Sequence, residues 1–133
     1  LVKLGAHEIR LFDRDSAKAQ QLAYDLNALD PQTVVTAVDD LDVASAHCDG
    51  LLNGTPLGMV GYPGSAFEPK AIANAAWVFD AVYTPIETMF LQSAKVTGAQ
   101  IISGYELFFF QGVHAWRHFS GRNVDTQKLR AAL

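Results

Sequence analysis

Short apolar segments rich in β-branched residues alternate along this chain with segments whose apolar residues recur at helical spacing. Strands are expected at residues 9–12, 33–38, 50–53, 76–82 and 100–102. Helices are expected between and after them, at residues 16–29, 41–46, 69–75, 86–97 and 104–119, and a last helix follows Asp125. Because strands that alternate with helices form βαβ units, this order predicts an α/β domain built on a doubly wound parallel sheet.

Composition and charge narrow the possible functions. Half of the 133 residues are hydrophobic and 18% are charged, which suits one globular domain over residues 1–133. The net charge of −4 and the scattered Lys and Arg residues argue against nucleic acid as a partner. The apolar runs are too short to cross a membrane. A single cysteine, Cys48, excludes an internal disulfide and fits a reducing compartment such as the cytoplasm.

An acidic turn, Asp13-Arg14-Asp15, follows the first expected strand. In a dinucleotide-binding fold an acid at this place accepts hydrogen bonds from the adenosine ribose hydroxyls and repels a 2′-phosphate, so Asp13 favours NAD over NADP. Arg14 and Lys18 favour the opposite preference, because either side chain could pair with a 2′-phosphate. Taken alone, the turn is also typical of a solvated helix start in which Asp15 or Ser16 caps the helix.

Two loops that follow strands carry polar groups at the edge where open α/β sheets bind their ligands. The first is Asn53-Gly54-Thr55-Pro56-Leu57-Gly58-Met59, in which Asn53 and Thr55 offer hydrogen bonds and Pro56 stiffens the turn. The second is Asp80-x-x-Tyr83-x-Pro85-x-x-Thr88, in which the Tyr83 hydroxyl could point into a cleft. The structural alternative is that both are ordinary loops, with Tyr83 packed in the core.

The helix expected from Gly104 is apolar on nearly all sides as far as Trp116. A helix of this kind is expected to be buried. Gln111 then places an amide within an apolar helix, where it needs hydrogen-bonding partners. A polyol acid bound at a cleft would supply such partners, and so would the neighbouring backbone.

These motifs resemble, in their order, the C-terminal NAD(P)-binding domain of the shikimate/quinate dehydrogenase family over about residues 4–121. The loop at Asn53 matches Asn-(Ala/Gly)-Thr-Pro-x-Gly-Met, and the segment from Gly104 to Gln111 matches Gly-x-x-(Met/Leu)-(Leu/Phe)-x-x-Gln. The resemblance implies a Rossmann-like fold and hydride transfer between NAD or NADP and shikimate or quinate. It implies substrate contacts from Tyr83 and Gln111. The cofactor contacts that it implies are Asp13, Arg14, Lys18, Asn53, Thr55, Pro56, Ala81 and Gly104.

The resemblance also implies parts that this chain lacks. In that family a first strand and a glycine-rich phosphate loop precede the region where this chain begins, and a separate N-terminal domain carries a catalytic Lys–Asp pair. We therefore expect Leu1 to lie inside a longer protein and the sheet to have a gap at its missing strand. No catalytic residue is assigned to this chain, whose last helices form a C-terminal extension, and a homodimer stays open.

Two alternative functions stay open from the sequence. One is a different enzyme on the same fold, such as an aminoshikimate or methylene-folate dehydrogenase. The other is a non-catalytic, truncated Rossmann-like fragment that binds a partner or nothing. The four histidines and Cys48 show neither a metal-ligand pattern nor a nucleophile with a flanking base, so we expect no metal and no covalent catalysis.

Overall fold

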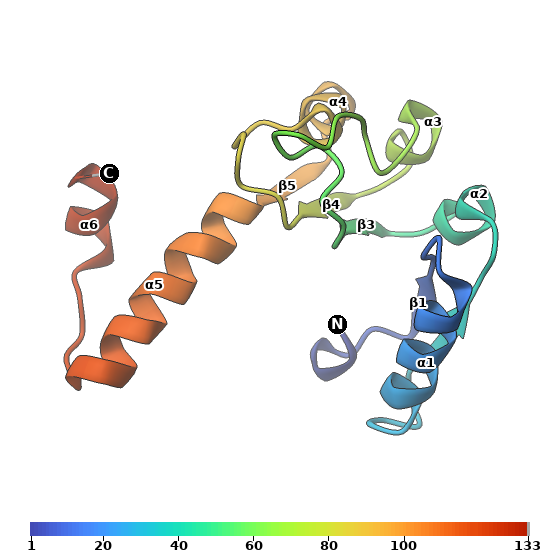
Figure 1. The fold of residues 1–133 in the computed structure, drawn as a ribbon, viewed down its shortest axis with the longest axis horizontal. Helices are drawn as coiled ribbons and strands as arrows, with labels where there is room; N and C mark the ends of the chain where they lie inside the picture. Colours follow the sequence, from blue (N-terminus) through green and yellow to red (C-terminus); the bar gives the residue numbers. More distant parts are fainter. Residues whose placement is uncertain (133) are drawn as a thin grey trace. The chain divides into compact units, whose positions relative to one another are not determined.

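The computed structural model describes residues 1–132 and folds them into two compact units, Leu1–Cys48 and the residues from Asp49 onward. Each unit has its own parallel sheet and its own helices (Figure 1). The predicted α/β class is therefore confirmed. The sequence predicted a sheet interrupted at its missing first strand, and the structure accordingly contains two separately hydrogen-bonded sheets, one of two strands and one of three. Each unit is described by itself below.

Unit 1 is a βαβ unit followed by a short helix. The strands β1 and β2 pair in parallel from Glu8↔Val34 to Leu11↔Ala37. Their inner side chains pack with α1 and η1 around a small buried core made of Val2, Ile9, Ala23 and Val35. The elements of this unit are η1 (Val2–Leu4), β1 (Glu8–Leu11), α1 (Ser16–Asn27), β2 (Val34–Ala37) and α2 (Leu41–Ser45).

Asn27 ends α1 two residues before the predicted boundary at Leu29 and ties the helix to β2. Its Nδ2 donates to the carbonyls of Ala23 and Val35 at 2.9 and 2.7 Å, and its Oδ1 accepts the N–H of Val35 at 3.0 Å. A single amide therefore satisfies both backbone groups of one strand residue. This clamp fixes the end of α1 against the sheet.

Unit 2 continues the alternation of strands and helices. Its elements are β3 (Gly50–Asn53), α3 (Pro69–Ile72), β4 (Trp77–Asp80), α4 (Met89–Thr97), β5 (Gln100–Ser103), α5 (Gly104–Ser120) and α6 (Thr126–Ala132). The strands lie in the order β3-β4-β5, and α3 and α4 lie on one side of the sheet (Figure 1). The core between them includes Leu51, Ile72, Val78, Phe90, Leu91 and Ala94.

The three strands of this sheet end at the same level. Asn53, Asp80 and Ser103 are the last residues of β3, β4 and β5, and they are direct partners in the parallel register. Ligands of open α/β sheets bind beyond the carboxyl ends of the strands. The fold therefore presents the loops after Asn53 and Asp80 and the start of α5 along one edge.

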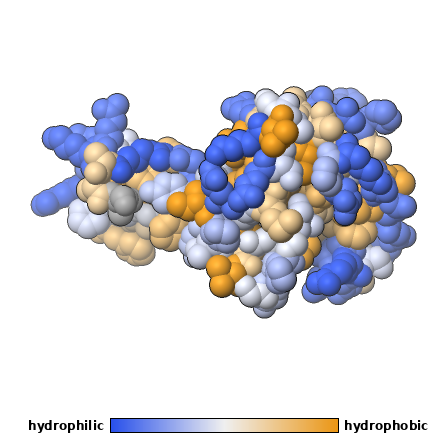
Figure 2. Space-filling view, turned by 90° about the horizontal axis from the view of Figure 1, so that it is seen from above, coloured by the Kyte–Doolittle hydropathy of each residue, from blue (hydrophilic) through white to orange (hydrophobic). Residues whose placement is uncertain are grey.

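α5 is much more exposed than its apolar sequence predicted. Gly104 and Phe109 are its buried residues, whereas Phe108, Trp116 and Phe119 are at least half exposed. The helix runs away from the sheet with α6 beside it (Figure 1), and apolar residues lie among hydrophilic ones at the surface (Figure 2). Burial needs a facing surface as well as apolar residues. Unit 2 supplies that surface at the first turn of α5 and along α6, so the expected burial of the whole helix is corrected.

α6 is attached to α5 by an ion pair between Arg130 and Glu106. Arg130 Nη1 donates to Glu106 Oε1 at 2.7 Å, and Nη2 donates to Oε2, so the guanidinium and the carboxylate form two parallel hydrogen bonds. The guanidinium carbon also lies 4.1 Å from the centroid of the Phe109 ring, within reach of a cation–π interaction. The hydrogen bond from Arg130 holds the pKa of Glu106 below its ordinary value of 4.5, and the pKa of Arg130 is raised by the same bond.

The attachment of α6 should weaken in acid. Because the folded-state pKa of Glu106 is depressed, the stabilisation is fully present above pH 4.5 and is lost as the pH falls through the folded-state value. Amide hydrogen exchange of α6, measured from neutral pH downward, should therefore show loss of protection below pH 4.5. The Glu106→Gln variant should lack this protection already at neutral pH. Equal protection of α6 in that variant would show that the helix is held by apolar contacts alone.

Candidate functional site

The motif loops of unit 2 lie together at the carboxyl edge of its sheet. The Val60 N–H donates to the Thr84 carbonyl at 3.1 Å, which joins the loop after β3 to the loop after β4. Between them is an open hollow whose walls are mostly apolar. The hollow is lined by Gly54, Thr55, Pro56, Met59, Ala81, Val82, Tyr83 and Thr84. The structure therefore brings together four of the residues predicted from separate motifs.

The carboxylate of Asp80 links the loop after β3 to the loop after β4 by hydrogen bonds. Its side chain is fully buried at the end of β4. Oδ1 accepts the Asn53 amide at 2.9 Å and the Val82 N–H at 3.1 Å, and Oδ2 accepts the Thr88 hydroxyl at 2.5 Å. Thr88 is also the N-cap of α4, where its Oγ1 accepts the Leu91 N–H at 3.3 Å. One carboxylate thus fixes the end of β3, the loop after β4 and the start of α4.

Asn53 uses its amide inside the protein. It is only 1% exposed, and its Nδ2 donates to the Leu57 carbonyl at 3.1 Å as well as to Asp80. Its Oδ1 accepts the Thr55 N–H at 2.9 Å and the Thr55 hydroxyl at 2.7 Å. In this structure the Asn53 side chain is engaged in hydrogen bonds that shape the loop. Thr55 is exposed at the rim of that loop.

Gly104 stands where the chain passes from β5 into α5, close to the loop after β4. A Cβ at this position would lie 2.4 Å from the Val82 carbonyl oxygen and 2.5 Å from the Ala81 carbonyl oxygen. These oxygens belong to backbone and cannot swing aside, so a residue with a side chain does not fit here. The absence of a side chain at Gly104 therefore lets α5 begin directly against the loop that carries Ala81 and Tyr83.

Tyr83 and Gln111, the two predicted substrate contacts, are each related to Phe108 of α5. The Tyr83 ring is half exposed and stacks on the Phe108 ring, with centroids 4.9 Å apart and 14° between the ring planes. Gln111 follows Phe108 by three residues on α5, so the two side chains share a helix face. Gln111 is exposed, which corrects the expectation of a buried amide. Both residues are accessible to a ligand.

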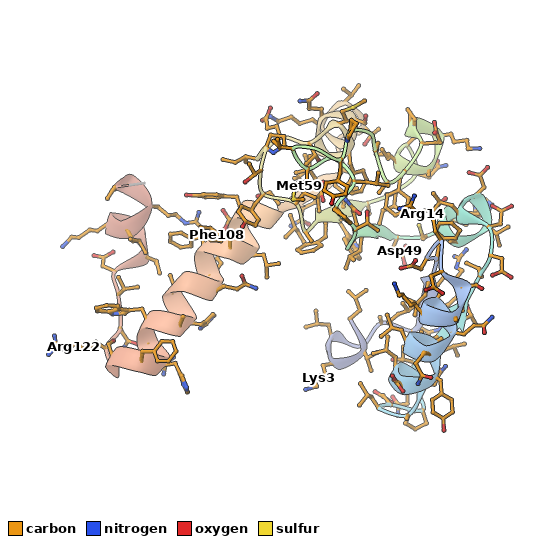
Figure 3. All side chains as sticks on the ribbon, viewed as in Figure 1. Lys3, Arg14, Asp49, Met59, Phe108 and Arg122 are labelled. Atoms are coloured by element: carbon orange, nitrogen blue, oxygen red, sulfur yellow. The ribbon has the colours of Figure 1, made fainter. Side chains whose placement is uncertain are left out.

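The predicted adenosine contacts form a separate set in unit 1. Asp13 follows β1, and its Oδ1 accepts the Asp15 N–H at 2.9 Å. Asp15 is the N-cap residue of α1, but its side chain makes no cap hydrogen bond, so the predicted side-chain cap is not formed. Lys18 Nζ lies 3.6 Å from Asp15 Oδ2. Asp13, Arg14 and Lys18 are all exposed, and Arg14 is labelled in Figure 3.

Sequence reasoning did not single out Asp80, Thr88 or Phe108 for a role. Asp80 carried a usable signal, because an acid that ends the apolar run Trp77-Val78-Phe79 must be paired when it is buried. Thr88 carried another, since it precedes an apolar helical segment as an N-cap residue does. The stacking of Phe108 on Tyr83 joins residues 25 positions apart and had no such signal. Within residues 1–132, no cluster of His, Cys, Asp and Glu side chains is suited to a metal ion, and no helix has the length and hydrophobicity to cross a membrane.

Known proteins share both the sequence and the fold of this chain, although no protein-family model matches it. It is 36% identical over 133 residues to the quinate/shikimate dehydrogenase (NAD(+)) of Corynebacterium efficiens, covering 98% of this chain and 47% of that protein. It matches the quinate dehydrogenase from Corynebacterium glutamicum in complex with NAD at a TM-score of 0.86 and 35% identity, over 98% of this chain and 47% of the other.

A third relative binds the other cofactor. The shikimate 5-dehydrogenase from Thermus thermophilus in complex with NADP(H) and shikimate matches at a TM-score of 0.81 and 25% identity, over 100% of this chain and 49% of the other. Relatives therefore use NAD or NADP, and the chain spans about half the length of the curated relatives that it matches. By sequence and by fold, the chain belongs to the shikimate/quinate dehydrogenase family and corresponds to its Rossmann-like NAD(P)-binding half.

Proposed function

We propose that residues 1–133 are the cofactor-binding half of a longer protein, called the longer protein below, that oxidises quinate or shikimate reversibly. The observation that carries the proposal is the meeting of three family motifs at one carboxyl edge of the sheet β3-β4-β5. When bound, the nicotinamide cofactor supplies the chemistry by accepting or giving a hydride at C4. The general acid–base pair belongs to the other half of the longer protein.

The residues of unit 2 fit the nicotinamide end of such a cofactor. The hollow between the two loops has apolar walls from Pro56, Met59 and Val82, which suit one face of a planar ring. Thr55 stands exposed at its rim, and its hydroxyl, which donates to Asn53 Oδ1 and accepts the Leu57 N–H, can accept one further hydrogen bond from a ribose hydroxyl or a carboxamide. Ala81 offers main-chain groups, and Gly104 lets α5 begin directly against the loop that carries Ala81. The protein thus binds and orients the ring.

The residues of unit 1 fit the adenosine end. Asp13 has one carboxylate oxygen engaged by the Asp15 N–H, and its second oxygen is available to the ribose hydroxyls. We propose that this acid makes NAD the preferred cofactor, because it would repel a 2′-phosphate. Arg14 on this exposed turn and Lys18 in the first turn of α1 would meet the phosphate of NADP once the carboxylate is removed.

The polyol acid is proposed to contact Tyr83 and Gln111. The phenol hydroxyl can donate to a carboxylate, and the amide can donate to and accept from ring hydroxyls. Both side chains are exposed in unit 2. Their proposed roles are binding and orientation of the polyol acid.

Turnover by the longer protein tests this function directly. The longer reading frame and the 133-residue chain are purified separately and assayed with quinate or shikimate and with NAD or NADP. We expect turnover from the longer protein and none from the 133-residue chain, which lacks the acid–base pair. Turnover of an aminoshikimate or methylene-folate substrate instead would identify a different dehydrogenase. Cofactor binding without turnover of any of these would make the protein a binding module.

Asp13→Asn should shift the cofactor preference of the longer protein toward NADP. The ratio of kcat/KM for NADP to kcat/KM for NAD should rise about tenfold, because like charges about 4 Å apart at a wet surface repel by about 1 kcal/mol or more. Asp25→Asn is the matched control, since it removes the same charge from an exposed site on α1 that bonds to Gln21. If the wild type prefers NADP and Asp13→Asn leaves the ratio of the two kcat/KM values unchanged, then Asp13 only shapes the turn.

A further inference from the structure

We propose that Phe108 is a positioning residue that sets the Tyr83 ring toward the polyol acid, an inference that rests on the proposed function. The two rings stack nearly parallel, with their centroids 4.9 Å apart. Tyr83 is 49% exposed and Phe108 is 51% exposed, so neither ring is held by burial in the core. Figure 3 shows Phe108 on α5. The face of the Phe108 ring is therefore a principal restraint on the orientation of the Tyr83 ring.

The backbone on both sides of this stack is already fixed. Val82, the residue before Tyr83, is buried, and its N–H is held by Asp80 at 3.1 Å. The start of α5 is held by the close approach of Gly104 to the carbonyls of Ala81 and Val82. A fixed backbone still leaves χ1 and χ2 of a tyrosine free to change rotamer. Contact with the face of the Phe108 ring restricts the rotamers of Tyr83, and Tyr83 stays half exposed.

Phe108 also relates Tyr83 to Gln111. Phe108 and Gln111 share a helix face, and both line the groove along α5 that Leu129 of α6 borders. Tyr83 lines the hollow at the sheet edge. Phe108 therefore contacts one of the two side chains proposed to hold the polyol acid and shares a helix face with the other. An aliphatic side chain would lack the flat face that stacking requires.

Phe108→Leu in the longer protein tests the inference. It should raise the KM for quinate or shikimate about 3- to 10-fold, the range expected for loss of one aromatic pair, and leave the cofactor KM unchanged. Phe108→Tyr keeps the flat ring and should restore the wild-type KM. Phe110→Leu is the matched control, because Phe110 is 43% exposed on the same helix and meets Phe109 edge-on at 5.4 Å. It should change neither KM.

A double-mutant cycle separates positioning from general damage. Because Phe108 acts through Tyr83, Phe108→Leu should have no further effect on substrate KM in a Tyr83→Ala background. Equal effects in both backgrounds would overturn the inference alone. NMR of the tyrosine rings should show Tyr83 shielded in the wild type and not in Phe108→Leu, and an unshielded wild-type ring would also overturn it. A wild-type longer protein that turns over neither polyol acid defeats the proposed function, and this inference falls with it.

Discussion

Replacing Asp80 by alanine should destabilise unit 2 by about 3–5 kcal/mol, since each buried donor left without an acceptor costs about 1–3 kcal/mol. Three donors lose their acceptor in a single substitution. They are Asn53 Nδ2, the Val82 N–H and the Thr88 hydroxyl, all now within 3.1 Å of the carboxylate. Native domains are stable by about 5–15 kcal/mol in total, so this loss would bring unit 2 close to unfolding.

Tryptophan fluorescence during urea unfolding measures this loss, because both tryptophans, Trp77 and Trp116, lie in unit 2. Glu87→Ala is the matched control: its carboxylate lies in the same loop but pairs with Lys95 at the surface, and its removal should cost less than about 1 kcal/mol. If Asp80→Ala does not fold, Asp80→Asn keeps the volume and one acceptor and should show a smaller loss. An unfolding midpoint equal to that of the wild type would mean that water replaces the carboxylate.

The Asp80 network also joins residues that belong to separate motifs. Asn53 ends one strand, Asp80 ends the next, and Thr88 begins α4, so a single buried carboxylate requires all three. The loops that it fixes carry Thr55, Pro56, Ala81 and Tyr83, which line the hollow proposed for the nicotinamide. Stability and site geometry therefore depend on the same hydrogen bonds. A change that relaxes Asp80 should lower activity before it unfolds the protein.

Much of this fold could be predicted from local sequence signals. The strand at Gly50–Asn53 matched its expected bounds, and the helix from Gly104 was expected to reach about Phe119 and reaches Ser120. Apolar runs, glycines and cap residues act over a few residues, so they are readable in the sequence. The ends of helices were predicted less accurately where contacts with residues distant in the sequence determine them. α1 stops at Asn27 because that amide binds Val35 of the next strand.

The predictions that needed correction concern partners in space. An apolar helix was expected to be buried, yet α5 leaves Phe108 and Phe119 exposed, because a hydrophobic pattern does not specify a facing surface. The sequence also did not predict that the Asn53 amide is buried and bonded to Asp80 and Leu57, because these partners come from the folded loops.

Gly104→Ala should lower kcat/KM of the longer protein about 100-fold, because a displacement of about 1 Å at a reacting centre can cost that factor. The added Cβ would lie 2.4 Å from the Val82 carbonyl oxygen and 2.5 Å from that of Ala81. Either α5 or the loop after β4 must move to relieve the contact. Both movements displace groups assigned to the site: Tyr83 moves with the loop, and Gln111 moves with the helix.

Gly112→Ala separates this steric effect from the general consequence of replacing a helical glycine. Gly112 lies on the same helix, and a Cβ there would meet no atom within 4 Å. Alanine is the better helix former by about 0.8–1 kcal/mol, so this variant should keep wild-type kcat/KM and gain thermal stability. Gly104→Ala should instead lose activity and stability together, since the helix propensity it gains is smaller than the cost of overpacking against backbone. Wild-type activity in Gly104→Ala would show that the loop after β4 shifts without consequence, and the hollow beside Ala81 would then not be where the nicotinamide ring binds.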